Sequence, residues 1–207
     1  MKPARPARIV IFAKAPQPGF AKTRLIPVLG AQGAADLARR MLVQTVRKAL
    51  AAGLGPVELC VTPSAADPVW QTLALPDAVQ WSDQGEGDLG EKMARAAQRV
   101  LESGASVLLI GTDCPQLSVD HLRHAAAALA QADAALLPTF DGGYALLGLN
   151  RFHRSLLSGI AWSSTSVASE TLDRFGQLGW AVHRQPMLHD IDEPADLQWL
   201  PPDMAGE

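Results

Sequence analysis

Short apolar runs alternate with amphipathic segments along the chain. The runs are rich in β-branched residues and leucine and predict buried strands; they cover residues 9–13, 57–62, 79–81, 106–111, 134–138, 144–149 and 182–183. Apolar residues at helical spacing, together with capping and proline signals, predict helices between them; these cover residues 33–52, 88–101, 118–131 and 165–175, with a short helix opening at 67–68 and a terminal helix at 194–200. The pattern indicates an α/β fold with a mainly parallel sheet covered on both faces.

The chain has 207 residues without an internal repeat or a compositional break. We therefore expect a single domain over residues 1–207, with loose tails at 1–7 and 201–207. Hydrophobic residues make up 48% and charged residues 19%, which is typical of a globular protein. No apolar stretch reaches the length of a signal peptide or a membrane span, so we expect a cytoplasmic protein without a membrane partner.

Charge is distributed unevenly along the chain, although the net charge of −3 argues against a nucleic-acid partner. The cations that precede the first acidic residue are Lys2, Arg5, Arg8, Lys14, Lys22 and Arg24. The acidic residues that crowd near the other end are Asp190, Asp192, Glu193 and Asp196. The two groups could meet in the fold across an anion and a cation. The alternative is a basic tail and a solvated helix end, and we favour it for the first three cations.

The loop after the first strand carries Lys14, Gly19, Lys22 and Arg24. Glycine permits close approach of a ligand to the backbone, and the cations suit a polyphosphate. The loop is not a P-loop, because Ala21 replaces the glycine before Lys-Thr. The loop therefore predicts a phosphate site, with an ordinary basic surface loop as the alternative.

Two acidic turns are candidates for a metal site. Asp113 follows the most apolar strand, and Asp190 and Asp192 lie on one side of an extended segment. Ligands bind at the carboxyl ends of parallel strands, where carboxylates can hold Mg²⁺ or Mn²⁺. The alternative for Asp113 is that it stabilises a turn, and the alternative for Asp192 is that it is the N-cap of the terminal helix.

Two further segments could contact a substrate. Asp141, Gly142, Gly143 and Tyr144 join two strands at the same sheet end, where paired glycines would let a sugar lie against the backbone. An ordinary turn is the favoured alternative. The pair Trp162 and Ser163 could form a stacking and hydrogen-bonding wall, although tryptophan is more often simply packed.

Taken in order, these segments resemble one family. The motifs that carry the resemblance are Phe12-Ala-Lys-Ala-Pro-Gln-Pro-Gly19, Lys22-Thr-Arg-Leu25, Gln84-Gly-Glu-Gly-Asp-Leu-Gly90, Gly111-Thr-Asp-Cys-Pro115, Asp141-Gly-Gly-Tyr144, Trp162-Ser163 and Asp190-Ile-Asp-Glu-Pro194. The chain resembles the bacterial glycosyltransferases grouped with arsenosugar-biosynthesis enzymes, within the nucleotide-diphospho-sugar transferase superfamily. The resemblance implies a three-layer α/β/α, Rossmann-like GT-A fold with a mixed, mostly parallel sheet.

The resemblance also implies roles for individual residues. It places the metal at Asp113 and Asp192, with Asp190 as the substitute for the second ligand. It places the phosphates on Lys14, Gly19, Lys22 and Arg24. The segment that frames the nucleobase or ribose comprises Gly85, Gly87, Leu89 and Gly90.

Two reactions stay open at this point. The family grouping favours transfer of a sugar from a nucleotide-diphosphate sugar to a small acceptor, with Asp141 as a candidate base. The stretch Lys22-Thr-Arg-Leu25 also resembles phospholactate guanylyltransferase-type enzymes, and three cations suit an NTP better than a diphosphate. A non-catalytic nucleotide-binding protein is the third hypothesis.

Overall fold

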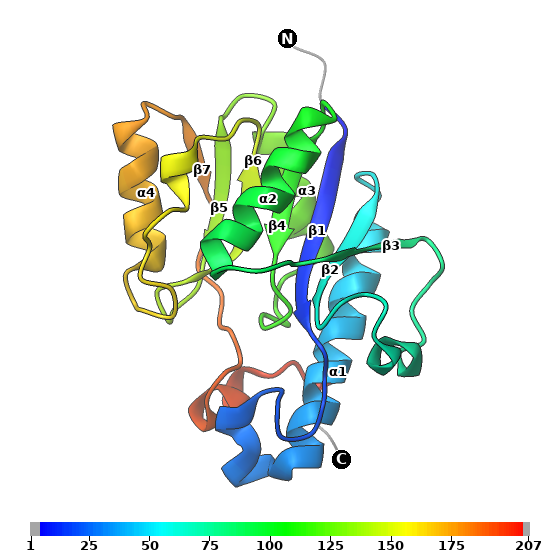
Figure 1. Cartoon of the computed structure of the whole chain (residues 1–207). Coiled ribbons are helices and arrows are strands. Elements are labelled where there is room, and N and C mark those ends of the chain that lie inside the picture. Colours follow the sequence, from blue (N-terminus) through cyan, green and yellow to red (C-terminus); the bar gives the residue numbers. More distant parts are fainter. Residues whose placement is uncertain (1–4, 205–207) are drawn as a thin grey trace.

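The computed structural model describes residues 5–204, which form one seven-stranded sheet flanked by helices (Figure 1). The strands are β1 (Ala7–Lys14), β2 (Val57–Thr62), β3 (Val79–Asp83), β4 (Ser106–Ile110), β5 (Ala134–Pro138), β6 (Tyr144–Leu149) and β7 (Val182–Arg184). Their order in the sheet is β3-β2-β1-β4-β6-β5-β7. Only β6 runs antiparallel to its neighbours β4 and β5, so the prediction of a mixed, mostly parallel sheet is confirmed.

Helices cover both faces of this sheet. They are α1 (Ile26–Ala52), α2 (Leu89–Glu102), α3 (Val119–Ala128) and α4 (Val167–Gln177), with short 3₁₀ helices at Thr23–Leu25, Pro68–Thr72, Arg154–Leu156 and Pro194–Trp199. Figure 1 shows α2 and α4 on one face and α1 and α3 behind the sheet. The three-layer α/β/α architecture is therefore confirmed. None of the helices within residues 5–204 is both long and apolar enough to cross a bilayer.

Strand alternation divides the core between the two faces. Ile9 and Ile11 of β1 pack toward α1 and α3, whereas Val10 packs toward α2 and α4. Successive strand residues point to opposite faces, so a strand buried on both sides needs a continuous apolar run. This explains why the apolar runs located the strands correctly.

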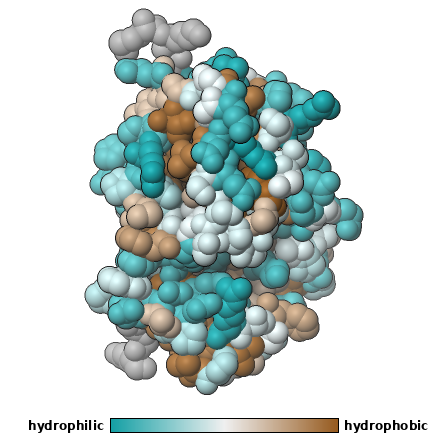
Figure 2. Space-filling view, turned by 90° about the vertical axis from the view of Figure 1, so that its left-hand side faces the viewer, coloured by the Kyte–Doolittle hydropathy of each residue, from teal (hydrophilic) through white to brown (hydrophobic). Residues whose placement is uncertain are grey.

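A third cluster of buried residues lies beyond the carboxyl ends of the strands. It joins the start of α1 to the C-terminal segment, and its members are Leu25, Ala34, Leu37, Met41, Ile191 and Met204. We call this cluster and the segments that carry it, residues 15–41 and 190–204, the lower lobe. It forms the lower part of the molecule in Figure 1, and hydrophobic colouring gathers at the same end in Figure 2.

The lower lobe corrects two predictions about helix ends. Helix α1 begins at Ile26 rather than at residue 33, and it is interrupted at Gly30, where φ is 69° and ψ is 165°. Glycine adopts this conformation readily, so the first turn changes direction without ending the element. The terminal segment from Pro194 is a 3₁₀ helix whose N-cap is Glu193, so the N-cap role considered for Asp192 is wrong.

Two of the described residues that the sequence assigned to loose tails are buried instead. Ala7 is buried in β1, and Met204 is buried in the lower lobe. Arg8 likewise belongs to β1, where its guanidinium donates to Glu58 at 3.1 Å. Lys2 and the rest of residues 1–4 and 205–207 lie outside the described residues.

Candidate functional site

A cavity of about 550 Å³ lies where β1, β2 and β4 end, between the sheet and the lower lobe. At this edge β1 has β2 on one side and β4 on the other, which is the position where α/β sheets bind ligands. The predicted site residues that line the cavity are Lys14, Lys22, Arg24, Leu89, Asp113, Tyr144 and Asp192. The structure therefore brings the early cations and two of the acidic positions together.

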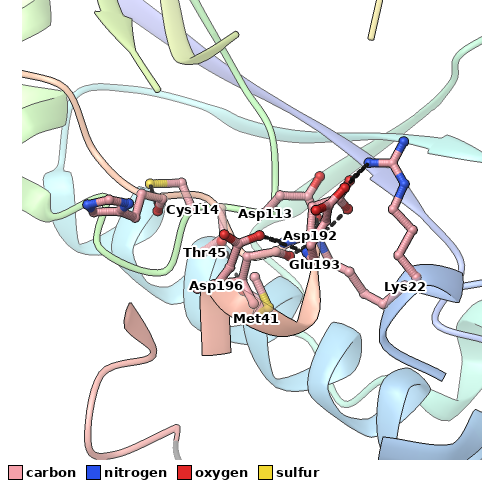
Figure 3. Close-up of polar contacts among 11 residues, drawn as sticks. Lys22, Met41, Thr45, Asp113, Cys114, Asp192, Glu193 and Asp196 are labelled. Atoms are coloured by element: carbon pink, nitrogen blue, oxygen red, sulfur yellow. Dashed lines mark hydrogen bonds and ion pairs between the residues drawn. The ribbon is translucent and has the colours of Figure 1, made fainter. Parts of the chain in front are cut away.

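The ammonium of Lys22 lies between the two acidic turns. Its Nζ forms an ion pair with Asp113, donates to the carbonyl oxygen of Ile191 at 2.6 Å, and lies 3.5 Å from Oδ1 of Asp192. Figure 3 shows Lys22, Asp113 and Asp192 pointing toward one another. The Lys22 side chain is only 7% exposed, whereas the Asp113 side chain is 56% exposed. The carboxylates therefore face the cavity, and the buried Lys22 side chain contacts them from the protein interior.

The second acidic position is held by a network of its own. Asp192 Oδ2 accepts from Arg24 at 2.7 Å, and Glu193 lies 3.9 Å from the same guanidinium. The backbone amides of Asp192 and Glu193 donate to Asp196 Oδ2 at 3.0 and 2.7 Å. These bonds fix the acidic turn and aim Asp192 at the basic loop.

The basic loop itself is tightly turned. The amides of Phe20 and Ala21 both donate to the carbonyl of Gln17, and Gly19 has φ 81°. Lys22 has φ 48° and ψ 45°, a left-handed conformation that is unfavourable for a residue with a Cβ. Gly19 serves this turn and does not line the cavity.

The lining also includes residues outside the predicted site, among them Phe20 and Gln84. Phe20 is 72% exposed and lines the cavity from the loop. Gln84 is buried, and its Nε2 donates to the carbonyls of Ala13 and Cys60 at 3.1 Å each, which ties the ends of β1 and β2 together. An aromatic residue in a polar loop and an amide directly after a strand were the available signals for them.

The segment before α2 is mainly structural. Asp88 and Glu91 form a capping box, as predicted from their spacing, and Leu89 then faces the cavity. Gly85 and Gly87 have positive φ and lie outside the lining, as does Gly90. Gly90 allows close packing instead, because a Cβ there would lie 2.2 Å from the carbonyl oxygen of Leu157.

The turn between β5 and β6 lies beside the cavity rather than in its lining. Asp141 Oδ1 accepts from Thr139 Oγ1 at 2.5 Å and from the Gly143 amide at 2.9 Å. Gly142 packs against Thr165, whose carbonyl oxygen would lie 2.1 Å from a Cβ at position 142. Of this motif only Tyr144 reaches the lining.

Asp190, Trp162 and Ser163 also lie outside the lining. Burial, followed by the negative charge of Asp141, raises the pKa of Asp190 to about 6. The ion pairs of Lys22 within the described residues are with Asp113 and Asp192, and Asp190 is not among them. The Trp162 ring packs on Gly90, and Ser163 has φ 66°.

The oxygen atoms around Lys22 are the donor atoms available to the expected metal ion. Within residues 5–204 no three or more His, Cys, Asp or Glu side chains are grouped to hold a metal ion, so Asp190 does not join the other two carboxylates. Asp113, Asp192 and the Ile191 carbonyl nevertheless already surround a cation, the Lys22 ammonium. Magnesium prefers one or two carboxylates and completes its shell with water and phosphate oxygens, so this donor set fits it.

Fold and cavity together define the class: the chain has the nucleotide-diphospho-sugar transferase fold. It is similar to a protein from Desulfovibrio desulfuricans G20 whose name assigns it, provisionally, to the nucleotide-diphospho-sugar transferases, with 31% identity, a TM-score of 0.86 and coverage of 93% of this chain and 85% of that one. Residues 45–164 match the family described as uncharacterized proteins conserved in bacteria, DUF2064, and the chain belongs to that family. No curated protein matches the sequence.

More distant structures share the fold alone. Rv0371C from Mycobacterium tuberculosis H37Rv, solved in complex with manganese, is 16% identical with a TM-score of 0.56, over 94% of this chain and 97% of that one. The 4-diphosphocytidyl-2C-methyl-D-erythritol synthase from Anaerococcus prevotii DSM 20548 is 11% identical with a TM-score of 0.58, over 95% and 96%. The grouping with arsenosugar-biosynthesis enzymes stays a prediction.

Proposed function

We propose that this protein transfers a group from a nucleotide-activated donor, with Mg²⁺ or Mn²⁺ held by Asp113 and Asp192. The observation that carries the proposal is the convergence of Lys22, Asp113 and Asp192 in one cavity at the carboxyl ends of β1 and β4. A bound divalent cation would neutralise the negative charge of a leaving diphosphate. The oxygen donor set around Lys22 and the manganese complex of Rv0371C support this assignment.

Glycosyl transfer is our first candidate. The 31% identity to the Desulfovibrio protein, which is named for nucleotide-diphospho-sugar transfer, supports a sugar donor. In this proposal Lys14, Lys22 and Arg24 bind the diphosphate, and Leu89 contacts the nucleoside. The turn around Asp141 and Tyr144 would face the sugar or the acceptor. Both bonds of Asp141 in the turn use Oδ1, so Oδ2 can accept from a hydroxyl.

Nucleotidyl transfer is the second candidate, and the charge of the cavity favours it. Lys14 adds a third cation to the lining, beside Lys22 and Arg24. Once a metal neutralises the two carboxylates, all three cations can face the ligand, which suits the triphosphate of an NTP. Positioning and charge neutralisation supply most of the catalysis in such transfers.

The products distinguish the two reactions. The purified protein is incubated with nucleotide sugars and with NTPs, each with Mn²⁺, with Mg²⁺ and with EDTA, and with a panel of small acceptors. Release of nucleoside diphosphate that an acceptor accelerates supports glycosyl transfer. Pyrophosphate release from an NTP supports nucleotidyl transfer. Metal-dependent binding without either product supports a non-catalytic nucleotide-binding protein.

A further inference from the structure

We propose that Lys22 fills the cation position between Asp113 and Asp192 in the free protein, so that a divalent metal enters only together with a phosphate group that draws the Lys22 ammonium away. This inference rests on the proposed function, because it concerns the same site. It assigns Lys22 two positions, one on the carboxylates and one on the phosphates. Lys22 is then a ligand-binding residue that couples binding of the metal to binding of the phosphate group.

The surroundings of Lys22 Nζ support the first position. Three oxygen atoms from separate groups, Asp113, Asp192 and the Ile191 carbonyl, converge on this one atom. An array of hard oxygen donors is what Mg²⁺ and Mn²⁺ require. Because two cations at one point repel strongly, the ammonium and a metal cannot share this position.

The charge balance of the site supports exclusion of the metal. Within residues 5–204, Lys22 is the only cationic side chain within 4.0 Å of the Asp113 carboxylate. Arg24 accompanies it only on Asp192. The free site is therefore already neutralised by the chain itself, and a metal would have to displace Lys22 to bind Asp113.

The cavity offers the Lys22 ammonium a second position. Its nitrogen ends a flexible four-carbon stem, and the residue lines the cavity that also contains Lys14 and Arg24. A nucleotide phosphate in that cavity offers the ammonium a new partner, while the metal takes over the carboxylates. After both exchanges, Lys22 is paired with the phosphate and the carboxylates are paired with the metal. Binding of the phosphate and binding of the metal should therefore favour each other.

The test measures Mn²⁺ binding to the full chain, without turnover, by the loss of the free-ion electron paramagnetic resonance signal and by calorimetry. Wild type is compared with Lys22→Met and Lys22→Gln, first with Mn²⁺ alone and then with ADP, CDP, GDP or UDP. Lys48→Met is the matched control, because Lys48 Nζ also donates to a backbone carbonyl at 2.6 Å, that of Pro115, but contacts neither carboxylate. The Gln variant retains a hydrogen-bond donor if the Met variant folds poorly.

We expect wild type and Lys48→Met to bind Mn²⁺ weakly alone and about tenfold or more tightly with a nucleoside diphosphate, within the range usual for coupled sites. Both Lys22 variants should bind Mn²⁺ alone at least about tenfold more tightly than wild type. Adding Asp113→Asn to Lys22→Met should remove that gain.

Two results would overturn the inference. One is tight Mn²⁺ binding by the free wild-type protein, and the other is no gain in either Lys22 variant while wild type still binds Mn²⁺ with nucleotide. The proposed function fails separately, if neither wild type nor any variant binds Mn²⁺ with or without nucleotide.

Discussion

The backbone amide of Ile191 donates a 2.9 Å hydrogen bond to the carbonyl oxygen of Asp113. This bond attaches the C-terminal segment to the end of β4 and sets the Asp192 carboxylate beside that of Asp113. Ile191 itself is fully buried in the lower lobe, next to Leu25 at the end of the basic loop. The acidic and basic halves of the site are therefore assembled by one small apolar cluster.

Asp113→Asn should abolish metal-dependent nucleotide binding while leaving the fold intact. The change removes the charge that would hold the metal, whose contribution is several kcal/mol, or a loss on the order of 100-fold or more in affinity. Calorimetric titration with GDP or UDP in Mn²⁺ measures the loss, and circular dichroism checks the fold. Unchanged metal-dependent binding would remove Asp113 from the site.

Lys22→Ala should weaken binding of a nucleotide more than binding of the matching nucleoside. The ammonium can reach phosphate but has no assigned contact with the base or ribose, so its loss should cost about 1.5–3 kcal/mol of a charge-assisted interaction. Titration with GMP, GDP and guanosine, repeated with the uridine series, gives the comparison. Equal losses for nucleoside and nucleotide would contradict the phosphate role.

The left-handed backbone at Lys22 predicts an unusual order of stability. Relative to Lys22→Ala, Lys22→Gly removes about 1–2 kcal/mol of left-handed strain. It also loses about 0.5–1 kcal/mol of stability, because glycine loses more chain entropy on folding. The glycine variant should therefore be more stable by about 0.5–1 kcal/mol in urea denaturation. The same pair at Lys92, within helix α2, should show the opposite order. The same order at both positions would argue against the strained turn.

Gly90→Ala should destabilise the protein by about 1–3 kcal/mol, because overpacking forces neighbouring atoms apart. Its Cβ would lie 2.2 Å from the Leu157 carbonyl oxygen and within 3.0 Å of Trp162 ring atoms. Gly176→Ala in helix α4 is the matched control, since a Cβ there meets nothing within 4 Å. The control should be neutral or stabilising by up to about 1 kcal/mol. Equal stability of the two variants would refute the close packing of α2.

The pKa of Asp190 predicts a pH effect on stability. Because burial and the charge of Asp141 raise this pKa from 3.8 to about 6, the folded state binds more protons than the unfolded state between these values. The free energy of unfolding of the wild type should therefore fall, relative to Asp190→Asn, as pH rises from about 4 to about 6. Urea denaturation of both proteins in EDTA at a series of pH values checks this. A pH-independent difference would contradict the shift.

The fold was largely predictable because its central strands, such as β2, β4, β5 and β6, are buried on both faces. Short continuous apolar runs such as residues 106–110 indicate central strands, and the helical spacing between them indicates the layers. The start of α1 was missed because Gly30 breaks the pattern without ending the helix. Met204 was assigned to a tail because a lone apolar residue near a chain end carries no periodic signal.

The site residues were predictable where they lie at or just after the end of a strand. Lys14 is the last residue of β1 and Asp113 follows the end of β4, and both line the cavity. Asp190 and Asp192 were indistinguishable from alternation alone. Their different surroundings depend on distant segments: Asp192 pairs with Lys22, whereas burial and the charge of Asp141 act on Asp190.

The amino-acid pattern by itself determined the α/β architecture, the strands that end at one edge and the charged residues placed there, because burial and periodicity are local properties of the chain. Only the tertiary structure decided which charges meet. The ion pairs of Lys22 with Asp113 and Asp192, the bond between Ile191 and Asp113 and the apolar lower lobe join segments far apart in sequence, and no local spacing records those contacts.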